Sequence, residues 1–159
     1  MKKKVYIYSL ILFIIDFIVK RLITHFIKLN TSIKIIKNFF YLTYVRNTGA
    51  AFSLFSNQKI LLLLITVIVL FYINNYLTKN KLKNYEEIAF SLITGGILGN
   101  LFDRIVYSYV IDYFDFRLFS YNFAIFNLAD SFIVIGVFIL IIFSFIYERK
   151  SKNGNNSRK

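Results

Sequence analysis

The sequence contains no cysteine, no proline and no tryptophan, and its only histidine is His25. Without cysteine the chain can form no disulfide, no thiolate metal site and no cysteine nucleophile. A single histidine argues against a histidine-based metal site and against a Ser-His-Asp triad. We therefore expect a protein that uses neither a metal ion nor another cofactor.

Acidic residues are scarce as well, with 8 Asp and Glu against 20 Lys and Arg, which gives a net charge of +12. A basic balance of this size can indicate nucleic-acid binding. Here, however, the basic residues cluster at both ends and in one middle loop, where anionic lipid headgroups explain them more simply. We therefore expect membrane lipids as partners of this charge, and no nucleic acid.

Apolar residues dominate the 159-residue chain, of which 57% is hydrophobic and 19% aromatic, with a mean hydropathy of +0.59. Soluble domains are usually about 45–50% apolar, so this composition indicates a membrane protein. Four stretches are long enough to cross a bilayer as helices, which takes about 20 residues each. They cover residues 5–24, 60–77, 86–106 and 127–147.

The first apolar stretch follows a cluster of lysines and so resembles a secretory signal peptide. No small-residue cleavage site follows it, and Asp16 and Lys20 lie within it, which favours a retained helix. The lysines, the basic loop 78–84 and the C-terminal tail are expected in the cytoplasm. The sequence thus predicts an all-α integral membrane protein with four transmembrane helices and both termini cytoplasmic. Residues 1–150 form its single domain, and residues 151–159 form a basic, disordered tail.

Two segments between the spans are expected on the extracytoplasmic side. Ile33–Tyr44 is rich in β-branched and aromatic residues, which indicates a small β-rich element between helices 1 and 2. It leads into the turn signal Asn47-Thr48-Gly49, in which Gly49 permits a backbone angle or a close approach that a side chain would prevent. Tyr107–Phe126 is interpreted as an aromatic outer loop that suits the headgroup region.

Two pairs of residues are spaced one helical turn apart. Asp16 and Lys20 can pair, either as an ion pair at the helix end or as a pair that faces the bundle. Gly95 and Gly99 form a small-xxx-small pair that lets another helix approach closely.

Polar residues also share faces near the outer ends of the last two spans. Asn100, Asp103 and Arg104 lie on one helix face, although a solvated helix end would also account for Asp103 and Arg104. Asp112 and Asp115 are three apart, so on a strand they point to opposite faces, one to the bundle and one to solvent. The sequence assigns no role to Asp115.

This topology brings polar residues from several segments to one level, the outer membrane face. They are Asn47, Asn100, Asp103, Arg104, Asp112, Asn127 and Asp130. Asp112 and Asp130 are expected to meet, and two carboxylates in close contact share a proton because they cannot both ionise easily. Such a pair can hydrolyse a peptide bond: one carboxylate deprotonates water while the other donates a hydrogen bond to the carbonyl oxygen.

Taken together, these motifs resemble the lipoprotein signal peptidase (signal peptidase II) family of bacteria. The matching segments are Asp16 with Lys20 on the first span, RNTGAAF at Arg46–Phe52, GGILGNLFDR at Gly95–Arg104, VIDYF at Val110–Phe114 and FNLADS at Phe126–Ser131. They extend over nearly the whole chain in the order of the family. Phe17, where relatives often have glutamine, and the missing tryptophan and proline are departures that do not touch the aspartate pair.

The resemblance implies an aspartic endopeptidase with several passes through a bacterial cytoplasmic membrane and an active site at its extracytoplasmic face. Its implied substrates are diacylglyceryl-modified prolipoproteins, from which it removes the signal peptide by cutting before the lipidated cysteine. The implied catalytic pair is Asp112 and Asp130. Residues implied to position substrate or support the pair are Asn47, Gly49, Asn100, Arg104 and Asn127, and the implied structural polar partners are Asp16, Lys20 and Asp103. Inhibition by the cyclic peptide globomycin is implied as well, and we expect a monomer.

A small transporter or channel subunit, with Asp112 and Asp130 as a proton relay or ion site, is the main alternative. Against it, the sequence has no internal repeat, and its polar residues gather at one face instead of lining a path across the bilayer. A scaffold protein held by polar helix contacts would explain Gly95 and Gly99 but not the acidic residues. The sequence therefore favours the peptidase, and leaves open which lipoproteins it processes and how they enter.

Overall fold

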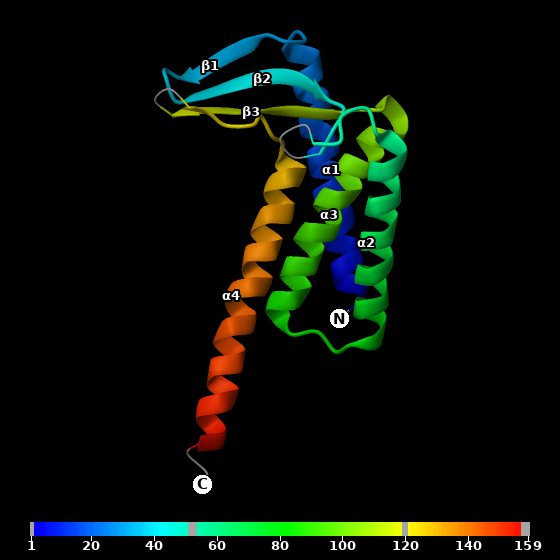
Figure 1. The fold of residues 1–159 in the computed structure, drawn as a ribbon, viewed down its shortest axis with the longest axis vertical. Helices are drawn as coiled ribbons and strands as arrows, with labels where there is room; N and C mark the ends of the chain where they lie inside the picture. The colour runs from blue at the N-terminus through cyan, green and yellow to red at the C-terminus, as the bar shows by residue number, and fades with distance from the viewer. Residues whose placement is uncertain (1, 51–53, 119–120, 157–159) are drawn as a thin grey trace.

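The computed structural model describes residues 2–50, 54–118 and 121–156. Its helices are α1 (Lys2–Phe26), α2 (Lys59–Lys79), α3 (Asn84–Tyr107) and α4 (Leu128–Asn156). Its strands are β1 (Ser32–Ile36), β2 (Phe40–Asn47), β3 (Val110–Leu118) and β4 (Tyr121–Asn122). The helices extend from one side of the sheet, and both chain termini lie at the end of the bundle away from it (Figure 1).

The helix α3 is the one around which the other helices pack, with contacts to α1, α2 and α4. A Cβ atom on Gly95 would lie 2.7 Å from Cβ of Leu12 on α1, and one on Gly96 would overlap the Ala129 carbonyl at the start of α4. The close approach predicted at Gly95 and Gly99 is therefore confirmed on the α1 side. The contact of Gly96 with α4 was not predicted.

Among the described residues, three helices are long and apolar enough to cross a membrane. They are α2, α3 and the part of α4 from Leu128 to Tyr147, which match the predicted spans 60–77, 86–106 and 127–147. Apolar side chains on these helices are exposed, for example Phe71 at 65% and Phe138 at 59%. The predicted first span, 5–24, is a continuous helix within α1 but carries charged residues and is not among the three. A fourth span and the orientation of the termini therefore stay predictions.

The last helix is longer than the sequence predicts. It continues to Asn156, past the predicted end of the span at residue 147, and so runs through most of the tail 151–159 for which we expected disorder. The residues directly after the span, ERK at 148–150, are good helix formers, whereas the further course of the helix through Asn153 and Gly154 is not explained by local propensity. Residues 157–159 lie outside the described part of the chain.

The β-rich element is also larger than predicted. β1 and β2 confirm the strands expected in Ile33–Tyr44, but β3 and β4 come from Tyr107–Phe126, the segment interpreted as an outer loop. The strands form one antiparallel arrangement in the order β1-β2-β3-β4. The prediction of a β-rich element between the first two helices is therefore confirmed for β1 and β2, and the sheet extends beyond it into the segment interpreted as a loop. Pairing of β3 with β2 satisfies backbone groups that a loop would leave to water, and the Val, Ile, Tyr and Phe residues of β3 favour a strand.

The pairing of β2 with β3 contains one irregularity. Leu42 lies opposite Phe114 and Val45 lies opposite Asp112, so two residues of β2 face a single residue of β3. The two residues are Thr43 and Tyr44. Such an extra residue is a β-bulge, and it changes which side chains beyond it point to each face of the sheet.

Apolar residues pack the sheet against the C-terminal end of α1. Ile23 and Ile27 at that end belong to one buried cluster with Ile111 and Tyr113 of β3. Because neighbouring residues of a strand point to opposite faces, the burial of Ile111 and Tyr113 turns Asp112 between them to the other face. The packing of α1 against the sheet thus determines the direction of this carboxylate.

We predict that Gly99→Ala destabilises the fold, because a Cβ atom at this position would overlap Asp16 Oδ2 on α1. Overpacking of this kind typically costs about 1–3 kcal/mol, so thermal unfolding in detergent should show a lower midpoint. Ile88→Ala, at an exposed position of the same helix, is the control. An unchanged midpoint for Gly99→Ala would contradict the tight packing of α1 on α3.

Candidate active site

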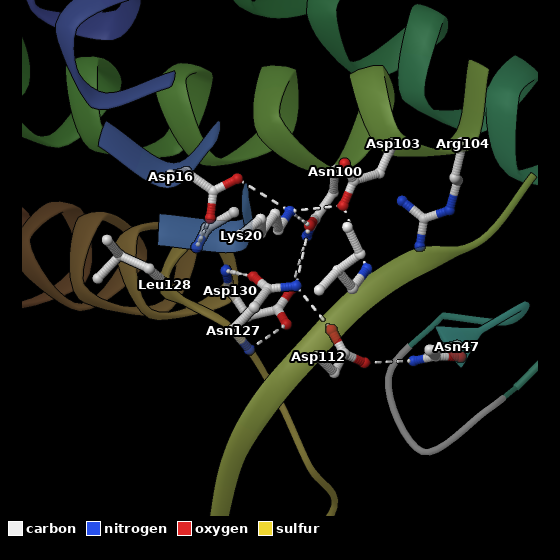
Figure 2. Close-up of polar contacts among 12 residues, drawn as sticks. Asp16, Lys20, Asn47, Asn100, Asp103, Arg104, Asp112, Asn127, Leu128 and Asp130 are labelled. Atoms are coloured by element: carbon white, nitrogen blue, oxygen red, sulfur yellow. Dashed lines mark hydrogen bonds and ion pairs between the residues drawn. The ribbon is translucent and has the colours of Figure 1, made fainter. Parts of the chain in front are cut away.

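The polar residues that the sequence predicts to meet do lie together, at the sheet end of the bundle (Figure 2). They come from α1, β2, α3, β3 and the beginning of α4. The labelled residues there include Asp16, Lys20, Asn47, Asn100, Asp103, Arg104, Asp112, Asn127 and Asp130. Hydrogen bonds and ion pairs join these side chains into one network that begins at α1.

Lys20 on α1 is buried, with only 1% of its surface exposed, and it connects α1 to α3. Its Nζ lies 2.8 Å from Asp16 Oδ2 and 3.0 Å from Asp103 Oδ2, and it donates to Asn100 Oδ1 at 3.0 Å. Of the two alternatives for Asp16 and Lys20, the pair that faces the bundle is therefore correct. Asp103 is also not at a solvated helix end, since it is 2% exposed.

The two carboxylates paired with Lys20 also accept backbone N–H groups. Asp16 Oδ1 accepts from Ala129 at 3.0 Å, and Asp103 Oδ2 accepts from Ile111 at 3.1 Å. Each of these donors is the residue directly before one of the two candidate catalytic aspartates. One buried ion cluster thereby holds the backbone at both positions.

Asp130 lies in the first turn of α4 because the chain there forms a reciprocal cap. Asn127 Oδ1 accepts the N–H of Asp130 at 2.9 Å, and Asp130 Oδ2 accepts the N–H of Asn127 at 3.2 Å. This is the geometry of a capping box, with Asn and Asp in place of the more frequent Ser or Thr and Glu. The remaining oxygen, Oδ1, accepts from Asn100 Nδ2 at 2.7 Å.

Asp112 is 2% exposed and is held by two amides. Asn127 Nδ2 donates to its Oδ1 at 2.7 Å, and Asn47 Nδ2 donates to its Oδ2 at 2.9 Å. Burial and the nearby charge of Asp130 raise the pKa of Asp112 to about 7, although both amide hydrogen bonds lower it. A carboxyl group with a pKa near neutrality is suited to acid-base catalysis.

Amide side chains connect the two aspartates (Figure 2). Asn127 Nδ2 donates to Asn100 Oδ1 at 3.1 Å as well as to Asp112, and Asn100 donates in turn to Asp130. Asp112 and Asp130 therefore belong to one hydrogen-bonded unit, in which each amide orients the next.

Both aspartates line a single cavity of about 580 Å³. Its other polar lining residues are Asn47, Asn100, Arg104 and Ser131, and its apolar lining includes Val110, Phe123, Ile125, Phe126, Ile133 and Val134. A cavity with apolar walls and a few convergent polar groups is the usual form of a substrate site.

Arg104 joins α3 to the turn that follows β2. Its Nη2 donates to the Gly49 carbonyl at 3.0 Å, and the Gly49 N–H donates to Asn47 Oδ1 at 2.9 Å. No described glycine has a positive φ, so Gly49 does not adopt the left-handed backbone conformation that glycine permits. Among the described residues, Arg104 Nε has no hydrogen-bond partner. Residues 51–53, which include the end of the RNTGAAF motif, lie outside the described part.

The expectation that one of Asp112 and Asp115 points to solvent is wrong, because Asp115 is buried as well, at 4% exposure. Thr43 Oγ1 donates to its Oδ2 at 2.6 Å, and Arg117 Nη2 lies 2.5 Å from the same oxygen. Burial alone would raise the pKa of Asp115, but the hydrogen bonds from Arg117 and Thr43 hold it below its ordinary value. The spacing of Asp115 and Arg117, two apart on a strand, could have indicated this pair, whereas Thr43 depends on the register of β2.

The chain is similar to known proteins over most of its length. The sequence model of the family Signal peptidase (SPase) II matches residues 8–146. A lipoprotein signal peptidase of Halothermothrix orenii is 43% identical over 145 residues, which cover 91% of this chain and 97% of that protein. A bacterial membrane enzyme determined by the in meso method at 2.3 Å resolution has 32% identity and a TM-score of 0.84, over 93% of this chain and 90% of its own. Another, at 1.9 Å, has 34% identity and a TM-score of 0.77, over 87% and 90%.

The fold and its neighbours define the class of the protein, a membrane enzyme. The chain belongs to the signal peptidase II family. The resemblance drawn from the sequence motifs is therefore confirmed, and so is the expectation of an aspartic protease.

We predict that Lys20→Met, which keeps most of the side-chain volume, strongly destabilises the protein. It leaves two carboxylates buried without their shared cation, and loss of one partner from a buried ion pair costs about 3–5 kcal/mol. Thermal unfolding of purified protein in detergent measures the loss, with Lys28→Met, an exposed lysine just after α1, as control. Equal midpoints for the two variants would show that the buried cluster does not stabilise the fold.

Proposed function

We propose that this chain removes the signal peptide from diacylglyceryl-modified prolipoproteins and cuts before the lipidated cysteine. Membership of the signal peptidase II family supports signal-peptide cleavage, and the related protein of Halothermothrix orenii is named a lipoprotein signal peptidase. The observation that carries the proposal is that Asp112 and Asp130 line one cavity and are connected by amides.

In the proposed reaction the two aspartates share one proton and act as a dyad. Asp130 accepts a proton from water, whose oxygen attacks the carbonyl carbon of the scissile peptide, while Asp112 gives its proton to the carbonyl oxygen. The tetrahedral diol then collapses: the C–N bond breaks, a proton passes to the leaving amine, and the shared proton is restored. The raised pKa of Asp112 supports its assignment as the proton donor.

The surrounding residues divide between dyad support and substrate positioning. Asn47, Asn100 and Asn127 donate to the carboxylates and so keep both in fixed orientations. Arg104 lines the cavity and holds the turn at Gly49 in place, and its guanidinium group suits a substrate carbonyl. The apolar walls of the cavity suit the apolar residues of a signal peptide and the acyl chains of its lipid.

The buried ion cluster has a structural role in this proposal. Asp16, Lys20 and Asp103 support the backbone before each catalytic aspartate. They are too deeply buried, at 0%, 1% and 2% exposure, to take part in substrate contacts.

We also propose that all four helices cross a bacterial cytoplasmic membrane, with both termini inside and the sheet and dyad at the extracytoplasmic face. The position of both termini at the end away from the sheet supports this arrangement (Figure 1). The charges within α1 do not oppose it, because Asp16 and Lys20 are buried in the bundle while Ile14 and Ile18 point outward at 44% and 50% exposure. The protein is expected to act as a monomer within the lipid bilayer.

Asp112→Asn and Asp130→Asn should each abolish cleavage of a lipidated precursor, because neither amide can take up or release the shared proton. The assay follows the precursor and the released signal peptide with purified enzyme in detergent or proteoliposomes. Glu86→Gln makes the same chemical change at the far end of α3 and should cleave normally. Turnover at the wild-type rate in either aspartate variant would refute the dyad.

The substrate class is tested with the same precursor carrying or lacking the diacylglyceryl group. Cleavage of the lipidated form only, and its inhibition by globomycin, are the expected results. A transporter would instead move solute or protons in proteoliposomes and ignore globomycin, which would overturn the proposed function.

The rate should fall at both low and high pH, because the dyad loses its base when both carboxyls are protonated and its acid when both are ionised. The Asn47 hydrogen bond favours ionised Asp112, whose pKa is about 7. Asn47→Ala should therefore raise this pKa and move the alkaline limb of the pH–rate profile upward. A wild-type profile that is flat from about pH 4 to 9, or an alkaline limb that moves down in the variant, would contradict the assignment.

A further inference from the structure

Asp115 is the one acidic residue of the sheet for which the proposed reaction has no use, although it is nearly as well buried as Asp112. Its carboxylate accepts from Thr43 Oγ1 at 2.6 Å and from Arg117 Nε at 3.2 Å. Arg117 stacks over the Tyr41 ring, 4.0 Å from its centroid. Thr43 Oγ1 in turn lies 2.7 Å from Ser32 Oγ on β1. Asp115 of β3, Thr43 of β2 and Ser32 of β1 thus form one row of hydrogen-bonded side chains across three strands.

That row coincides with the β-bulge of β2. Thr43 is the first of the two residues that face Tyr113, and Asp115 binds its hydroxyl group. The second residue, Tyr44, is held by the segment before β1. Its N–H donates to Thr31 O at 3.3 Å, and its carbonyl accepts from the N–H of Asn30 at 2.8 Å. Both residues of the bulge are therefore fixed by specific partners.

The bulge decides which residue of β2 reaches the dyad. Before it, Tyr41 pairs with Asp115 on one face of the sheet, and Leu42 pairs with Phe114 on the other. In an uninterrupted strand, side chains alternate, so Asn47 would share the face of Tyr41 and point away from Asp112. The one extra residue reverses this order beyond the bulge. Asn47 then points to the face of Asp112 and donates to its Oδ2 at 2.9 Å.

We propose that Asp115 is a positioning residue for catalysis: by holding the Thr43 hydroxyl it fixes the bulge in β2, and the bulge directs Asn47 to Asp112. The inference rests on the proposed function, because its effect is read through the dyad. Arg117 contributes by holding Asp115 charged and in place, and a charged acceptor makes the stronger hydrogen bond.

If Thr43 and Asp115 only connected neighbouring strands, their loss would have a different effect. It would lower stability and substrate binding without any special relation to Asn47. The positioning role requires that the loss of the Thr43 hydroxyl act mainly through Asn47, and hence on the chemical step. A double-mutant cycle between the two residues separates these cases.

The test uses the full-length enzyme with a lipidated precursor. Thr43→Val keeps the β-branched shape but removes the hydroxyl, and we expect kcat to fall by about tenfold, the scale of one hydrogen bond, with KM little changed. Thr43→Ser restores the hydroxyl and should recover kcat to within about twofold. Thr78→Val makes the same change at the exposed end of α2 and serves as the matched control.

In the cycle, adding Thr43→Val to Asn47→Ala should cost less than about twofold further, because the route through Asn47 is already lost. A full further tenfold loss, or a loss confined to KM, would overturn the proposal. Asp115→Ala, measured in the same cycle, provides a second reading if Thr43→Val folds poorly by circular dichroism. If the wild-type enzyme does not cleave the precursor at all, the proposed function fails instead, so the two failures are distinguishable.

Discussion

The buried ammonium group of Lys20 holds together the end of the helix bundle that lies next to the sheet. Two carboxylates in an apolar interior are costly unless each is paired and hydrogen-bonded. Lys20 supplies one positive charge to both Asp16 and Asp103, so each carboxylate needs a further donor. The donors are backbone N–H groups from β3 and from the start of α4. The partners of one buried cation therefore bring four segments of the chain to a common point, beside the two aspartates of the proposed dyad.

The same cluster accounts for the close packing around α3. Gly99 leaves the space that the Asp16 carboxylate occupies, and Gly96 admits the backbone at the start of α4. It also explains how α1 can carry charges and still have an apolar exposed face. Its polar groups turn inward to partners on α3, and its Ile and Leu side chains remain on the outer surface. The packing of α1 on α3 and the buried ion pairs depend on each other, because a shift of α1 would separate Lys20 from Asp103.

Much of this could be predicted from the sequence, because ionisable residues in apolar helices stand out singly. Asp16 was identified that way, Asp112 and Asp130 were identified by the motifs around them, and α2, α3 and α4 were located by their apolar runs. The strand β3 was not, because its backbone pairing with β2 is a contact between segments far apart in sequence. The burial of Asp115 was missed for the same reason: its partner Thr43 is set by a bulge whose position no local pattern reveals. What sequence periodicity cannot supply is the register between distant strands.

The two aspartates of the proposed dyad are supported in different ways, and this difference has a chemical consequence. Asp130 is partly exposed in the first turn of a helix and accepts a backbone N–H group in a reciprocal cap. Asp112 is buried within a strand and is held by two side-chain amides, Asn47 at the end of β2 and Asn127 just before α4. Carboxylates in unlike surroundings take unlike roles when one proton must be placed between them. In the proposed reaction, a pKa near 7 makes Asp112 the group that holds the proton until the peptide carbonyl arrives, and the hydrogen bond from Asn47 of β2 favours its ionised form.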